Sequence, residues 1–125
     1  MNQLHIFLSN LEHNYKVLRS HINSDTELIA VLKANAYGSK IVKISHKLES
    51  LGVNQIAVAY VDEGVYLRKQ GVKIPILIFY PQEENFEKLI KYNLEPSLYS
   101  IKTLSKFKKI INLQKKTKYP VHIKY

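Results

Sequence analysis

The stretch LIAVLKANAYG, residues 28–38, combines an apolar run with a lysine and a turn pattern. The five consecutive apolar residues 28–32 predict a fully buried strand, and Lys33 falls where that strand ends. In parallel α/β folds, ligands and catalytic groups gather at the carboxyl ends of strands. An amine beside an apolar strand end is partly removed from water, which favours its neutral, nucleophilic form. Lys33 is therefore a candidate Schiff-base lysine.

The residues around this lysine leave two interpretations open. In the plainer one, the stem of Lys33 packs on the sheet and its ammonium group reaches water. Asn35 and Gly38 tolerate a left-handed backbone, so they predict a tight turn after the strand. In the same plainer interpretation, Tyr37 is an aromatic side chain that packs over the strand end.

Helix and strand patterns alternate along the whole chain. Residues 1–8 alternate loosely as an extended segment. Ser9 and Glu12 form a capping-box pattern, which predicts an N-terminal helix that ends near residues 23–24. Beyond the first strand, further strands are expected at 55–59, 76–79, 96–99 and 120–123, with helices between them and Ser100 as the cap of the last helix.

This alternation with short connections predicts one α/β domain with a parallel sheet and right-handed crossovers. The pattern by itself allows two closures. One is a doubly wound sheet of the flavodoxin type. The other is the first five strands of an eight-stranded barrel, which normally takes about 250 residues.

Composition limits the class of protein. A hydrophobic content of 46% over 125 residues suffices for the core of one domain. No apolar run approaches the roughly 18 residues of a membrane helix, and the N-terminus lacks a secretion-signal pattern. The absence of cysteine excludes disulfides and cysteine metal sites and fits a cytoplasmic protein. His5, His13 and His21 lack metal-ligand spacing, so we predict no metal.

Positive charge is concentrated late in the chain. The net charge is +9, and residues 102–118 contain seven lysines and no acid. A nucleic-acid surface is one interpretation of this run. A solvated helix face is the favoured one, because interleaved arginines and aromatic platforms are missing.

One stretch carries a specific likeness: VLKANAYG, residues 31–38, closely resembles the pyridoxal-phosphate attachment motif of alanine racemases. The resemblance covers nearly the whole chain and includes residues 10–15, 57–64, 71–78 and 119–124. It implies a partial TIM-type (β/α) barrel of about five parallel strands with crossover helices, preceded by an N-terminal helix. Residues 1–125 would then be a single partial domain.

The resemblance also implies a function. Lys33 would bind pyridoxal phosphate covalently and act as an acid/base group in converting L-alanine to D-alanine for peptidoglycan synthesis. Tyr37 would hydrogen-bond the cofactor phosphate. The family works as a cytoplasmic homodimer on a small-molecule substrate, with no nucleic-acid or membrane partner.

The chain departs from the family pattern in two places. Ser39 and Lys40 stand where histidine and glycine commonly follow the motif. The family's last barrel strands and β-rich C-terminal domain are absent, so the isolated chain is expected to be inactive. Two alternatives stay open: a non-catalytic pyridoxal-phosphate-binding protein of the same barrel type, and a basic nucleic-acid-binding α/β module.

Overall fold

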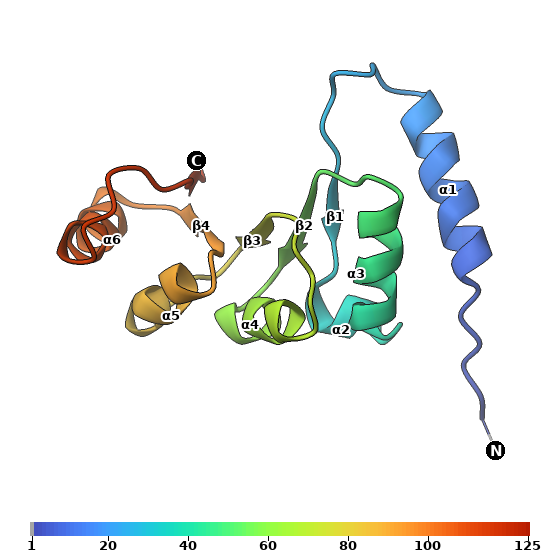
Figure 1. Cartoon of the computed structure of the whole chain (residues 1–125), viewed down its shortest axis with the longest axis horizontal. Helices are drawn as coiled ribbons and strands as arrows, with labels where there is room; N and C mark the ends of the chain where they lie inside the picture. Colours follow the sequence, from blue (N-terminus) through green and yellow to red (C-terminus); the bar gives the residue numbers. More distant parts are fainter. Residues whose placement is uncertain (1) are drawn as a thin grey trace.

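A computed structural model describes residues 2–125 as alternating helices and strands (Figure 1). The five expected strands and their crossover helices are confirmed. The elements in chain order are α1 Leu8–Ser20, β1 Ile29–Val31, α2 Lys33–Tyr37, α3 Ile41–Ser50, β2 Gln55–Val58, α4 Val61–Lys69, β3 Ile76–Ile78, the 3₁₀ turn η1 Glu83–Asn85, α5 Phe86–Lys91, β4 Glu95–Leu98, α6 Ile101–Leu113 and β5 His122–Ile123.

The strands form one parallel sheet in the order β1-β2-β3-β4-β5. A doubly wound sheet reverses its strand order at a switch point, whereas a barrel adds each new strand beside the last. Figure 1 shows the strands along an arc, with α3, α4, α5 and α6 around its outer side. The sheet is therefore an open segment of a β/α barrel, as predicted.

The core lies between the sheet and these outer helices. Phe86 and Phe107 pack edge to face with ring centroids 5.0 Å apart, and Phe107 meets Tyr119 in the same way at 5.5 Å. Aromatic pairs in this geometry add to the stabilisation that comes from burial alone. Strands β2 and β3 contribute side chains that are fully buried, including Ile56, Val58, Ile76 and Ile78.

The prediction that residues 28–32 form a fully buried strand was wrong. Strand β1 contains three residues, and Ile29 and Val31 are 44% and 39% exposed. Side chains alternate between the two faces of a strand, and the helices cover only one face of this sheet. Ala30 faces the helical layer, whereas Ile29 and Val31 lie on the uncovered face of an edge strand.

The N-terminal helix also differs from its prediction. Helix α1 begins at Leu8 with Phe7 as its N-cap and no capping side chain, and it ends at Ser20. The carboxylate of Glu12 instead accepts hydrogen bonds from Lys16 (2.6 Å) and from Lys47 of α3 (2.5 Å). Residues 2–7 form no strand, and position 1 of the expected extended segment lies outside the described residues.

The bonds of Glu12 join α1 to α3 and make this contact sensitive to pH. Hydrogen bonds from Lys16 and Lys47, together with their charges, lower the pKa of Glu12 from 4.5 to about 2. A carboxylate whose pKa is lowered by folding stabilises the folded state above its unfolded pKa. This stabilisation disappears as the pH falls through the folded pKa.

We therefore predict that Glu12→Gln lowers the thermal unfolding midpoint at neutral pH, but not at acid pH. The difference between wild type and variant should shrink between pH 4.5 and about pH 2, where Glu12 becomes protonated. Circular-dichroism melts across this range test the prediction. A difference that stays constant with pH would contradict it.

Candidate active site

Lys33 lies at the carboxyl end of β1, on the rim where all five parallel strands end. The amide of Leu32 donates to the carbonyl oxygen of Ala57 (2.8 Å), so the pairing of β1 with β2 continues to residue 32. Lys33 is the next residue, and its side chain is half-buried while Leu32 is buried. The structure therefore places the predicted lysine at the predicted end of its strand.

The backbone after Lys33 turns in the left-handed sense. Residues Ala34 to Tyr37 have φ values of 53°, 53°, 52° and 54°, and Gly38 has φ 86°. A left-handed conformation costs an L-residue roughly 1–2 kcal/mol. The predicted turn is confirmed at Asn35 and Gly38, but the left-handed run also includes two alanines and a tyrosine.

Local hydrogen bonds hold this turn. The amide of Ala36 donates to Leu32 O (2.9 Å), and the amide of Gly38 donates to Ala34 O (3.1 Å). The Oδ1 atom of Asn35 accepts a hydrogen bond from the amide of Ile41 (3.1 Å), which is the first residue of α3. Asn35 thus supplies an acceptor to a helix N-terminus whose own N-cap provides none.

Glu63 of α4 joins this turn to the next strand. Its Oε1 atom accepts a hydrogen bond from the amide of Ala34 (2.9 Å). Its Oε2 atom accepts hydrogen bonds from the amides of Ala59 (2.8 Å) and Tyr60 (2.9 Å), which follow β2. Glu63 was not among the site residues predicted from the sequence. The acid in the first helical turn was visible, but its partner 29 residues earlier was not.

Tyr37 lies in the same turn and is 66% exposed, so its side chain is accessible from solvent. Tyr60, Tyr80 and Tyr99 follow β2, β3 and β4 and are also exposed. The rings of Tyr60 and Tyr80 lie 6.0 Å apart, and the Nζ atom of Lys124 lies 5.7 Å from the Tyr80 ring centre. Lys124 is thus a second amine on the rim, after β5.

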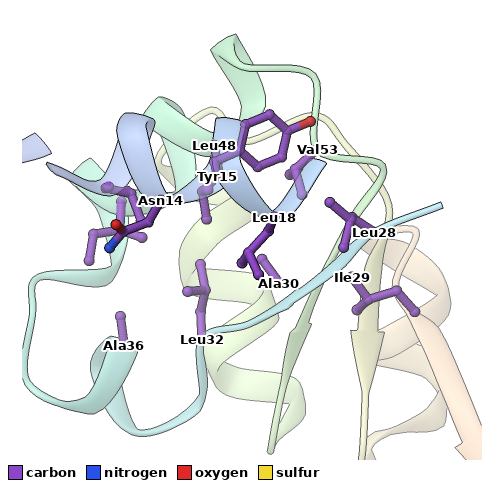
Figure 2. Close-up of a pocket in the computed structure, with 12 residues that line it drawn as sticks. Asn14, Tyr15, Leu18, Leu28, Ile29, Ala30, Leu32, Ala36, Leu48 and Val53 are labelled. Carbon is purple, nitrogen blue, oxygen red and sulfur yellow. The ribbon is translucent and has the colours of Figure 1, made fainter. Parts of the chain in front are cut away.

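An apolar cavity of about 280 Å³ lies beside this site, between α1, β1 and α3 (Figure 2). Its wall includes Leu18 of α1 and Leu48 of α3. It also includes Leu32, which precedes Lys33, and Ala36, which lies within the turn. Its lining carries no carboxylate, histidine or lysine. The cavity therefore borders the turn, and its polar lining side chains are those of Asn14 and Tyr15.

A polar cluster occupies the opposite ends of the strands. The Oε2 atom of Glu95 lies 2.7 Å from Gln55 Nε2 and 2.8 Å from His122 Nε2, and these residues begin β4, β2 and β5. Within residues 2–125, no group of three or more histidine, acidic or cysteine side chains is arranged to hold a metal ion. In the same part of the chain, no helix has the length and hydropathy needed to span a membrane.

The lysine-rich run lies largely on α6. Lys102, Lys106, Lys108 and Lys109 are exposed on α6, and Lys106 forms an ion pair with Glu83. Such a solvated helix face needs no nucleic-acid partner to explain it.

Fold and site together define a class: a parallel β/α-barrel segment with an amine at the carboxyl end of its first strand. The family model described as "Alanine racemase, N-terminal domain" matches residues 6–125. The chain belongs to this family, as its sequence indicated.

Individual relatives agree with this assignment. The alanine racemase of Carboxydothermus hydrogenoformans is 36% identical over 118 residues, which cover 94% of this chain and 32% of that protein. The structure of Clostridium difficile 630 alanine racemase in complex with cycloserine is similar with a TM-score of 0.90 and 34% identity, over 94% of this chain and 32% of that one.

A third relative is the Bartonella henselae alanine racemase with covalently bound pyridoxal phosphate. Its TM-score is 0.82 at 28% identity, over 93% of this chain and 34% of that one. The present chain spans about a third of the length of the relatives it matches.

The role of Asn35 in the turn leads to a prediction. Asn35→Ala removes the acceptor for the Ile41 amide and the residue that best tolerates the left-handed conformation. We expect the free energy of unfolding to fall by about 1–2 kcal/mol, measured by urea denaturation. Asn35→Asp keeps both properties and is the matched control. Equal stability of the alanine variant and the wild type would contradict this role.

Proposed function

We propose that this chain is the cofactor-anchoring segment of a pyridoxal-phosphate-dependent alanine racemase and that Lys33 is the attachment point. One observation carries the proposal. A half-buried lysine ends the first barrel strand and is followed by a strained left-handed turn, in a chain of the alanine racemase family. Strained backbone persists where the surrounding structure holds it, and it clusters at functional sites.

The residues present at the rim fit this cofactor. Lys33 supplies a primary amine, the group that would bind the cofactor's aldehyde covalently. Tyr37, four residues later, is exposed and supplies a hydroxyl for the phosphate. The net charge of +9 favours an anionic ligand. The Bartonella relative, which carries covalently bound pyridoxal phosphate, supports the same cofactor.

When bound, pyridoxal phosphate supplies an electron sink that stabilises negative charge at the α-carbon of an amino acid. Lys33 Nζ would hold the cofactor at the rim. Once released, the amine would take a proton from the α-carbon of alanine, or return one, on one face. Tyr37 would orient the phosphate. These roles require Lys33 and Tyr37 to lie close together, and the proposal is supported by their position at the two ends of the short segment Lys33–Tyr37.

The remaining features of the enzyme belong to the same proposal. The relatives are about three times as long as this chain, so racemisation of alanine for peptidoglycan synthesis, a homodimer and a cytoplasmic location are proposed for the whole enzyme. The division into a barrel segment at residues 1–125 and a separate C-terminal β domain is proposed with them.

The attachment site can be tested with pyridoxal phosphate, borohydride reduction and peptide mass mapping. We expect a visible absorption band and a reduced adduct concentrated on Lys33. Lys33→Ala should abolish the band, whereas Lys40→Ala and Lys124→Ala, which change two nearby rim or loop amines, should keep it. An adduct spread evenly over surface lysines, or concentrated on Lys124, would contradict the assignment.

Catalysis by the isolated 125-residue chain is a separate question. Racemisation needs a proton removed on one face of the α-carbon and one returned on the other, and a single amine serves only one face. We therefore predict that the cofactor-loaded chain forms no D-alanine above the level of the Lys33→Ala variant, measured by chiral chromatography. Clear turnover that depends on Lys33 would contradict this prediction.

A further inference from the structure

The left-handed turn after Lys33 needs support from outside itself. Four consecutive residues other than glycine hold positive φ, which costs an unsupported chain several kcal/mol, at roughly 1–2 for each residue. A strained segment of this kind persists only when its surroundings over-determine it. The bonds within the turn and the burial of Ala36 provide part of this support.

The carboxylate of Glu63 provides the link to the neighbouring strand. One of its oxygens accepts from Ala34, the residue directly after Lys33, and the other accepts from Ala59 and Tyr60 beyond β2. Bonds from backbone amides to a carboxylate are stronger than bonds between neutral groups. The first peptide unit after the lysine is therefore fixed relative to the sheet.

From this geometry we propose that Glu63 is a positioning residue for Lys33, an inference that rests on the function proposed above. Glu63 sets the direction in which the chain leaves β1 and thus where the lysine amine meets an aldehyde. It contacts the backbone next to Lys33 and acts through that backbone, not on the reacting atoms.

A purely structural role is the competing explanation, since Glu63 also caps α4 through the amide of Tyr60. Two substitutions separate the roles. Glu63→Asp keeps the charge in the first turn of α4 but is shorter by one carbon–carbon bond, about 1.5 Å, so it cannot span from α4 to Ala34. Glu63→Gln keeps the length of the side chain. Its carboxamide has only one acceptor oxygen, so its NH₂ group would face a backbone N–H that the second carboxylate oxygen accepts in the wild type.

Asp62→Asn is the matched control. It removes one charge from the same helical turn, and its exposed side chain is paired with Lys88 rather than with the backbone of the Lys33 turn.

The experiment measures the rate of pyridoxal-phosphate labelling at Lys33 relative to Lys124 in the same sample, after borohydride trapping. We expect both Glu63 variants to lower this ratio roughly tenfold, which corresponds to one lost charge-assisted hydrogen bond. Asp62→Asn should leave it within about twofold of wild type. Circular dichroism checks that each variant is folded.

The outcomes are distinguishable. A wild-type chain without preference for Lys33 overturns the proposed function and, with it, this inference. A wild-type preference that survives in a folded Glu63→Asp chain overturns the inference alone. If both variants unfold, hydrogen exchange of the Ala34 amide in the wild type decides. Protection of at least about tenfold over an unstructured peptide supports the link, and unprotected exchange overturns it.

Discussion

The carboxylate of Glu63 joins the ends of the first two strands, and the geometry of the candidate site depends on it. It accepts hydrogen bonds from three backbone amides, one in the turn after β1 and two in the segment after β2. A left-handed run of four residues does not form through local preference, because alanine and tyrosine disfavour it. The bonds to Glu63 and Asn35 and the burial of Ala36 offset that cost and define where the chain goes after Lys33.

The sheet order explains why this turn lies at a site at all. Each strand pairs with the one before it, so the carboxyl ends of all five strands form one rim. Lys33, Tyr37 and the exposed tyrosines after β2, β3 and β4 meet there, while Gln55, Glu95 and His122 lie at the other end. The helices cover one face of the sheet, and the guanidinium of Arg68 strengthens this layer by donating to the carbonyl oxygens of Val72, Ile74, Tyr92 and Asn93.

Much of this architecture could be predicted from the sequence. Hydrophobic periodicity identified every strand and crossover helix, Ser100 was recognised as the cap that accepts the amide of Thr103, and the VLKANAYG stretch identified the family. Features that depend on distant partners could not be predicted. The bond from Ala34 to Glu63 exists only once β1 and β2 are paired.

Predictions from local sequence patterns were wrong where contacts with distant residues determine the structure. Ser9 and Glu12 have capping-box spacing, yet Glu12 binds Lys47 of α3 and the helix begins one residue earlier than Ser9. An apolar run such as residues 28–32 reports strand propensity but not which face a neighbouring layer covers, so the exposure of Ile29 and Val31 was not visible. Gly38 indicated a left-handed residue, whereas nothing in Ala34 or Ala36 did.

Under the proposed function, Lys33, held by a left-handed turn on the barrel rim, is the residue to which the cofactor binds covalently. The decisive experiment is an experimental structure of the chain after loading with pyridoxal phosphate and reduction with borohydride. We expect density continuous from Lys33 Nζ to the cofactor, with Ala34 to Tyr37 still left-handed and the phosphate beside the Tyr37 hydroxyl. Cofactor on another lysine, or a right-handed or extended segment after Lys33, would contradict it.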